Sequence, residues 1–380
     1  MEVKTVQSPE WVKKIPNRMA EILVEKHLCK NGPVWGLARR DPTGKLYGDL
    51  EYEEIGSAGY CHIVDQYRLW DKVPPLTDQA KKKALQFWQS WQDPKSGLFK
   101  DPRDPNRTVG EKYVVNLIRF FGGEPLYPQK ESRTMLARDG SGNIDTKNFL
   151  ERAQNDPDWA QGGWAAGSHT GYMAREIFSA INNGHIELIP DLEKGLESVL
   201  SHQDPASGLW GPSSARLDRR LGGTLKVITR LYFGMGVNVP YAERLADSLI
   251  VHERNGDWYR AGQNFCVPQN VIYMVAFCLE ACDYRRDDLL GILESKVTEY
   301  EEWVLPDGTL LLHRGDPNSA CVEGVHLTSL SILSGYLAWK DSPFTTPIDM
   351  NSIRKRWQSY QYRAVVQKNG SVKVVDKGKQ

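Results

Sequence analysis

One phrase of eight residues occurs twice in this chain. Residues 92–99 read QDPKSGLF and residues 203–210 read QDPASGLW, so both copies follow the pattern Gln-Asp-Pro-x-Ser-Gly-Leu-aromatic. A single copy would indicate only a turn, because Asp-Pro and Ser-Gly pairs favour turns at the ends of helices. Two copies of this length indicate an internal repeat, and a repeat restricts the possible folds more than any other feature of the sequence.

The segments on either side of the phrase have the pattern of paired helices. An amphipathic segment precedes each copy, and a segment that begins with small residues and is apolar on most sides follows it. We name the first helix of each pair outer and the second helix inner. Outer helices are predicted over residues 8–27, 76–92, 145–155, 190–203, 240–253 and 285–303. Inner helices are predicted to begin near residues 57, 109, 165, 221, 267 and 322.

Six helical pairs predict an all-α fold, an (α/α)6 toroid in which the inner helices surround a funnel. Residues 1–345 are predicted to form this single domain. Residues 346–380 are predicted to be a short irregular extension packed on it, in which YRAVVQKNGSVKVV is compatible with a small hairpin over Asn369 and Gly370. The repeated phrase is then the hinge of a helical hairpin, and Gly97 and Gly208 are expected to have positive φ there.

The composition favours a small-molecule partner. The 48 basic and 48 acidic residues cancel, and no long run of one sign occurs, so nothing indicates a nucleic acid or a membrane surface as partner. No apolar stretch has transmembrane length and the first residues do not resemble a signal peptide, so a cytoplasmic location is expected. The six scattered cysteines do not resemble a disulfide framework. We expect no cofactor, and a homodimer is compatible with the sequence.

Polar residues gather in the first turns of the predicted inner helices. A buried polar group is costly unless it is partnered or hydrated, so such a cluster indicates a hydrated pocket. In chain order these residues are Tyr60, His62, Asp65, Glu111, Lys112, Tyr113, His169, Tyr172, Thr224, Lys226, Gln269, Asn270, Glu323 and His326.

Carboxylates in this set point to acid–base chemistry. Glu111 and Glu323 begin two inner helices, where a carboxylate can also serve to stabilise the helix terminus. With Asp65 in reserve, they fit the pair of acids that glycoside hydrolysis uses, one to protonate the leaving oxygen and one to activate water or attack carbon. We predict Glu111, Glu323 and Asp65 as catalytic residues.

Aromatic and basic residues supply the second half of a sugar site. The aromatic residues at the hinges, Phe99, Trp164, Trp210 and Trp258, can stack on pyranose rings. Converging helix N-termini favour an anion, so a uronate is a plausible substrate group, with Lys112, Lys226 or Arg314 as its partner. The residues predicted to bind substrate are Tyr60, His62, Tyr113, Trp164, His169, Trp210, Lys226, Asn270 and His326.

The hinge pattern, repeated across almost the whole chain, resembles the six-hairpin glycosidase and α/α-toroid superfamily. That group includes unsaturated glucuronyl hydrolases and also squalene-hopene cyclase and protein prenyltransferase toroids. The resemblance implies the architecture and does not select one activity. The D-x-D-D acid motif of the cyclases is absent. Cys321 and His326 are similar to part of the prenyltransferase zinc site, but a third ligand is not evident.

The sequence therefore predicts a glycoside hydrolase that acts on an oligosaccharide, with a uronate as one candidate sugar, and a polysaccharide lyase is less favoured. Two alternatives stay open. One is a cyclase or prenyltransferase-like enzyme, because an aromatic funnel also stabilises cations. The other is a toroid that binds sugar without catalysis.

Overall fold

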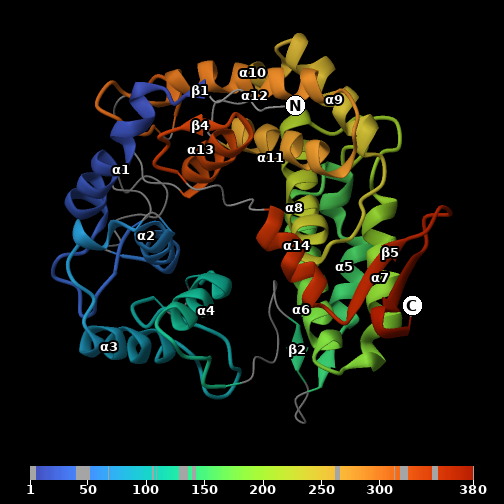
Figure 1. Ribbon diagram of the computed structural model, residues 1–380. Coiled ribbons are helices and arrows are strands. Elements are labelled where there is room, and N and C mark those ends of the chain that lie inside the picture. The colour runs from blue at the N-terminus through green and yellow to red at the C-terminus, as the bar shows by residue number, and fades with distance from the viewer. Residues whose placement is uncertain are drawn as a thin grey trace.

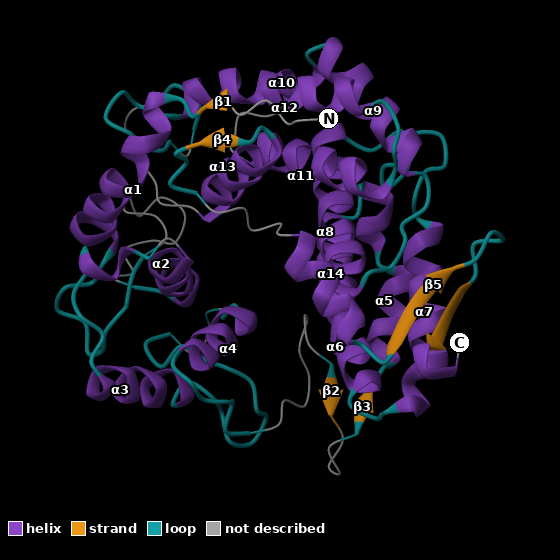
Figure 2. Ribbon diagram, in the orientation of Figure 1, coloured by secondary structure: helices purple, strands orange, loops and turns teal. Residues whose placement is uncertain are grey.

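The computed structural model describes residues 6–39, 52–66, 68–104, 107, 109–127, 136–138, 143–261, 266–311, 313–316, 324–344 and 350–379. This part of the chain is mostly helical, so the predicted all-α character is confirmed (Figure 2). Short strands occur only as three two-stranded pairs within it. None of the helices in these ranges combines the length and apolar character that a membrane span requires.

The outer helices lie close to their predicted ranges. Most bury apolar residues and turn their charged side chains outward, as in α7, where the buried residues are apolar or glycine. In α12 the buried Lys296 is an exception, and it pairs with Glu253 and Glu299. They are α1 (Glu10–Ile22), α3 (Asp78–Gln89), α5 (Lys147–Asn155), α7 (Ile189–Ser201), α9 (Ala242–Arg254) and α12 (Arg286–Tyr300). A π-helical turn, η1 (Leu23–His27), extends α1 to the residue at which its predicted range ends.

The inner helices also match their predictions. They are α2 (Glu54–Gln66), α4 (Glu111–Phe120), α6 (Trp164–Asn182), α8 (Leu217–Met235), α11 (Cys266–Ala281) and α13 (Gly324–Tyr336). Neighbouring inner helices pack on one another: α2 on α4, α6 on α8, α8 on α11 and α11 on α13. The last inner helix, α13, also contacts α2, which brings the two ends of the helical series together (Figure 1).

Glycine allows α6 and α8 to approach closely. A Cβ at Gly223 would lie 1.9 Å from the carbonyl oxygen of Gly162, and one at Gly167 would lie 3.2 Å from the carbonyl oxygen of Gly223. Such contacts leave no room for a side chain, so these glycines are required by packing. The sequence GSHTG at 167–171 therefore marks a helix interface.

Both copies of the repeated phrase form the same turn. Gln92 and Gln203 each donate through Nε2 to the carbonyl of the phrase glycine, at 2.8 and 2.9 Å. Those glycines, Gly97 and Gly208, have φ of 71° and 72°, so the predicted positive φ is confirmed. The backbone bridges that close the two turns pair Gln92 with Phe99 and Gln203 with Trp210. The phrase is thus a hinge built twice from the same side-chain contacts.

Small elements complete the fold. Strand β1 (Val6–Gln7) pairs in parallel with β4 (Trp339–Lys340), and β2 (Ala137–Arg138) pairs with β3 (Ile144–Asp145). The remaining helical segments are α10 (Asp257–Ala261) and the 3-10 turns η2 (Leu69–Asp71), η3 (Pro157–Gln161), η4 (Ile186–Leu188), η5 (Glu301–Trp303) and η7 (Lys377–Lys379).

The C-terminal extension is more regular than predicted. Residues that we expected to be irregular form a helix, α14 (Met350–Ser359), because Met350 and Ile353 bury one face of it. The hairpin is confirmed: β5 (Tyr362–Val366) pairs with β6 (Val372–Asp376) around Gly370, whose φ is 84°. Helix α14 packs on α8 and strand β6 packs on α7 (Figure 1).

Candidate functional site

The predicted residues of α2 divide between the interior and the solvent. Tyr60 is buried against Trp35, and burial raises the pKa of its hydroxyl, which has no hydrogen-bond partner among the described residues. His62 and Asp65 lie on the solvent-accessible side of the helix, three residues apart. Partial enclosure lowers the pKa of His62, and the Asp65 carboxylate opposes this shift. At neutral pH this pair therefore presents a carboxylate beside a mainly neutral imidazole.

Of the two predicted catalytic glutamates, only Glu111 lies among the described residues. It is the first residue of α4 and is half-buried, as is Tyr113 in the same turn. Glu323 and Cys321 lie outside the described residues, and so does the side chain of Lys112. Because α4 packs on α2, Glu111 and Asp65 belong to neighbouring inner helices.

The structure corrects two predictions about substrate contact. Trp210 is fully buried, and its indole Nε1 donates to the carbonyl of Val199 at 2.9 Å. His326 is also fully buried, with Nε2 2.9 Å from the carbonyl of Leu311 and Nδ1 3.3 Å from the Tyr300 hydroxyl. Burial lowers the pKa of His326 to about 4, so the ring stays neutral. Both side chains have internal partners and serve packing.

Three further predicted residues lie inside the protein. Phe99 and Trp258 are buried at their hinges, so they offer no ring face to a ligand. Asn270 is buried as well, but its Nδ2 has no hydrogen-bond partner in the part of the chain that the structure describes. The sequence does not show which hinge aromatics are buried, because the direction of each ring depends on the conformation of the turn after the outer helix.

Trp164 keeps a partly exposed ring among cations. It lies across α8 at Gly222, where a Cβ would come within 2.2 Å of the ring. The guanidinium carbon of Arg219 lies 5.7 Å from the ring centroid and the Lys226 Nζ lies 6.0 Å from it. Because residues 219, 222 and 226 are one turn apart on one face of α8, the two cations flank the ring on both sides. His169, on the same helix as Trp164, has Nδ1 3.5 Å from Arg152 Nη1.

A network of paired charges that sequence reasoning missed holds the first hinge. Asp101 is fully buried and accepts from Arg103 Nη2 at 2.7 Å and from Arg107 Nε at 3.0 Å. Arg107 Nη2 also donates to the buried Glu54 at 2.5 Å, and Glu54 accepts from the amide of Gly110 at 2.7 Å. Burial would raise the pKa of Asp101, but its two arginine partners keep it below its ordinary value. The network joins the start of α2 to the residue before α4.

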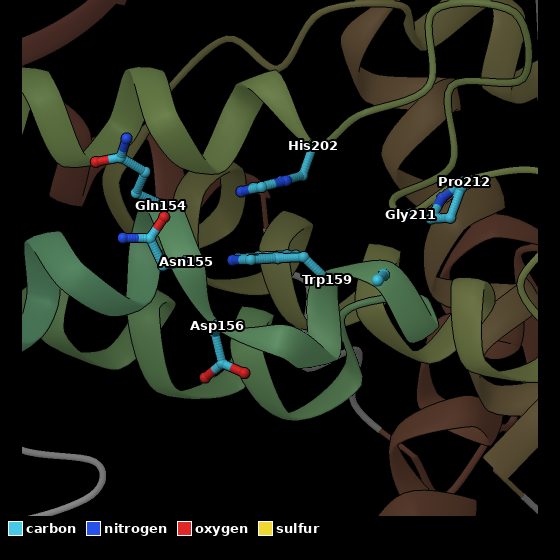
Figure 3. Close-up of a pocket in the computed structure, with 8 residues that line it drawn as sticks. Gln154, Asn155, Asp156, Trp159, His202, Gly211 and Pro212 are labelled. Carbon is cyan, nitrogen blue, oxygen red and sulfur yellow. The ribbon is translucent and has the colours of Figure 1, made fainter.

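A pocket of about 390 Å³ lies at the second hinge (Figure 3). Trp159 and His202 form its centre, with their rings stacked at 4.6 Å. The Trp159 indole donates to the carbonyl of Arg152, and His202 Nε2 lies 3.0 Å from the carbonyl of Ala153. The polar atoms named here therefore already have partners within the protein.

Comparisons of the chain with protein-family models, with curated proteins and with solved structures found no match. Within the described ranges, no group of three or more His, Cys, Asp and Glu side chains has an arrangement that could hold a metal ion. The chemical groups that the site offers are therefore single carboxylates, the exposed imidazole of His62 and the aromatic ring of Trp164 near two cations.

Proposed function

We propose that the protein is a carbohydrate-active hydrolase that cleaves a glycosidic bond in an oligosaccharide with an acidic sugar. The observation that carries this proposal is Trp164 with Arg219 and Lys226. An aromatic face stacks on the apolar face of a pyranose, and the two cations near the ring would attract a uronate carboxylate. Arg219 also pairs with Asp158 at 3.1 Å, so a uronate would share this guanidinium with that acid.

The architecture proposed for this enzyme is a closed toroid of six helical hairpins. Its support is the packing of α2 on α4, of α6 on α8, of α8 on α11 and of α11 on α13, together with α13 against α2 and β1 beside β4. Among the described residues, α4 and α6 do not pack closely on each other. In a closed ring the inner helices turn one face toward a shared centre, which would bring residues from distant parts of the chain together.

Asp65 and Glu111 are the described candidates for the acid and base. They lie on adjacent helices but at opposite ends: the residue before Glu111 contacts Glu54, the first residue of α2. Asp65 is further along α2 by about 16 Å, at 1.5 Å per residue, so each carboxylate is a separate candidate. Asp65 is exposed to solvent next to a histidine whose proton affinity is reduced. Glycoside hydrolysis needs one carboxyl group that holds a proton and another that activates water or attacks carbon. Glu323, which lies outside the described residues, stays the predicted partner of Glu111.

The test is a reducing-sugar assay on oligosaccharides matched in length, some with uronic acid residues and some neutral. We expect cleavage of the acidic series, loss of turnover by orders of magnitude in Glu111→Gln or Asp65→Asn, and weaker substrate binding in Trp164→Ala. Glu187→Gln, which changes an exposed carboxylate in η4, is the control that should keep full activity.

Two results would reject the proposal. Cleavage that persists in both carboxylate variants would exclude the acid–base assignment. Saturable binding of the acidic oligosaccharides with no cleavage by the parent would identify a binding protein in place of an enzyme. Stoichiometric zinc would favour the prenyltransferase-like alternative.

A further inference from the structure

A second pocket, of about 230 Å³, lies where α6, α8, α11 and α14 meet. Three arginines line it, each from a different helix: Arg175 from α6, Arg230 from α8 and Arg356 from α14. Phe233 and Ile353 form apolar parts of its wall. The volume corresponds to about eight water molecules in the liquid, which is enough for one anionic group with part of the molecule that bears it.

None of the three arginines forms an ion pair with a described residue. Arg175 has neither a hydrogen bond nor an ion pair within the described ranges. Arg230 donates to the Tyr172 hydroxyl at 2.8 Å and to Thr229 Oγ1 at 2.9 Å, but its Nε is buried without a partner. Arg356 donates to the carbonyl of Phe233 at 2.7 Å. All of these partners are neutral, so the positive charges are not compensated.

Glu280, an acid on the neighbouring helix α11, has partners outside the pocket. Glu280, at the end of α11, accepts from Arg354 Nη2 at 2.8 Å and from the Tyr336 hydroxyl at 2.9 Å. Arg354 and Arg356 are two residues apart on α14, yet only Arg354 has an acid. The remaining titratable side chain that lines the pocket is Tyr273, whose pKa burial raises to about 12, so it is neutral at physiological pH.

Glycine places two of the arginine stems. A Cβ at Gly171 would lie 2.7 Å from Cγ of Arg230, and a Cβ at Gly234 would lie 3.0 Å from Cδ of Arg175. Each of the two helices, α6 and α8, thus omits a side chain where the arginine of the other crosses it. Arg230 is held further by the Tyr172 ring, 4.2 Å from its guanidinium carbon. The aliphatic parts of Arg175 and Arg230 are therefore placed by the helix packing, and the guanidinium of Arg230 is held by Tyr172 and Thr229.

We propose that this pocket is a binding site for an anionic group, a carboxylate, sulfate or phosphate, held between Arg175, Arg230 and Arg356. Arg230 is half-buried and Arg175 and Arg356 are exposed to solvent, so the three like charges gather in a pocket that a ligand can enter. An anion with two or three oxygens would satisfy the guanidinium groups that have no acid. Burial, together with Arg230 and Arg356, lowers the pKa of Arg175, as expected for a cation without a counter-charge. The site stands on its own contacts and does not require the hydrolase activity.

Titration calorimetry on the full chain tests the site, with sulfate, phosphate and glucuronate as probes. We expect saturable binding of one anion per chain, weakened at least tenfold in Arg175→Gln and in Arg356→Gln. Arg354→Gln removes the same charge from α14 at a position that has its own acid, and we expect binding within twofold of the parent.

Gly234→Ala supplies a second variant in which every charge is kept. Its methyl group would displace the Arg175 stem, so we expect weaker anion binding than in the parent. Displacement of sulfate by glucuronate would identify a sugar acid as the ligand, and failure of glucuronate to compete would identify a small inorganic anion. Binding equal in Arg175→Gln, Arg356→Gln and the parent, which would indicate an adventitious ion only, overturns the proposal. Absence of saturable binding in the parent also overturns it.

Discussion

The two ends of the inner helices differ in whether their arginines have carboxylate partners. At the hinge end, Asp101 lies between Arg103 and Arg107, and Asp204 accepts from Arg220 Nη2 at 2.8 Å. Toward the other end, under α14, three arginines line one pocket without a carboxylate among the described residues. The hinge end also contains the larger hollow, the pocket of Figure 3.

The comparison separates charges that have a partner within the fold from charges that have none, and the proposed anion site depends on the second kind. A paired and hydrogen-bonded charge is already stabilised by the fold, whereas a cation among like charges without an acid is available to an anionic ligand. Four variants test the difference, from the largest expected effect on stability to the smallest.

Asp101→Asn should have the largest effect. The substitution keeps the shape of the side chain but leaves Arg103 and Arg107 without their shared acid, so we expect a loss on the order of 3 to 5 kcal/mol in the free energy of unfolding. Urea denaturation at pH 7 measures it. Asp218→Asn removes an acid from the ion pair with the exposed Arg216 and should cause only a small fraction of that loss. Equal losses in the two variants would remove the distinction between hinge and surface.

His326 should make the protein less stable in acid. Its folded pKa of about 4 is below the value near 6.5 of an unfolded histidine, so between these two pH values the unfolded chain binds a proton that the native chain excludes. As the pH falls from 7 to 4, this residue should lower the free energy of unfolding by up to about 3 kcal/mol. Urea denaturation at several pH values, in the parent and in His326→Gln, isolates its contribution. The same pH dependence in both proteins would contradict the burial of this ring.

Gly208→Ala tests the repeated hinge. Its φ of 72° is strained for alanine, and the new Cβ would lie 2.6 Å from the backbone nitrogen of Leu245. We expect a loss of about 2 to 3 kcal/mol by thermal or urea unfolding. Gly315→Ala is matched, because Gly315 has a φ of 70° with nothing within 4 Å of the added methyl group. Gly315→Ala should lose only the free energy of unfolding that the backbone strain costs, about 1 kcal/mol. A larger loss at Gly315 than at Gly208 would exclude close packing at the hinge.

Arg175→Gln should change stability least, in contrast to Asp101→Asn. Removal of one of three like charges relieves repulsion and breaks no ion pair, so we expect the free energy of unfolding to stay within about 0.5 kcal/mol of the parent or to rise. A loss comparable to that of Asp101→Asn would show that Arg175 has a structural partner, and the contrast between the two ends would fail.

The sequence predicts the helices well because their signals are local and repeated. Apolar periodicity and the hinge phrase together locate each helix within a few residues. The helix α14 was missed, although Met350, Ile353 and Trp357 have helical spacing, because its short and highly charged sequence was taken for an irregular tail. Its stability comes from packing on α8, which lies far away in the chain.

The candidate sites were harder to predict. Arg175, Arg230 and Arg356 come from three helices and share no motif, so only the packing of those helices brings them together. A signal was available in Gly171 and Gly234, since glycine inside an apolar helix indicates close approach of another segment. Trp210 and Trp164 follow related hinges, yet one is buried and the other lies over Gly222, a difference that depends on tertiary packing.

The most direct measurement of the contrast between the two ends is a crystal structure of the full chain with selenate, an anomalous scatterer with the shape of sulfate. We predict an anomalous peak within hydrogen-bond distance of Arg175, Arg230 and Arg356, and none in the pocket formed by Trp159 and His202. The peak should vanish in crystals of Arg175→Gln. A peak at the hinge pocket with an empty arginine pocket would contradict the account.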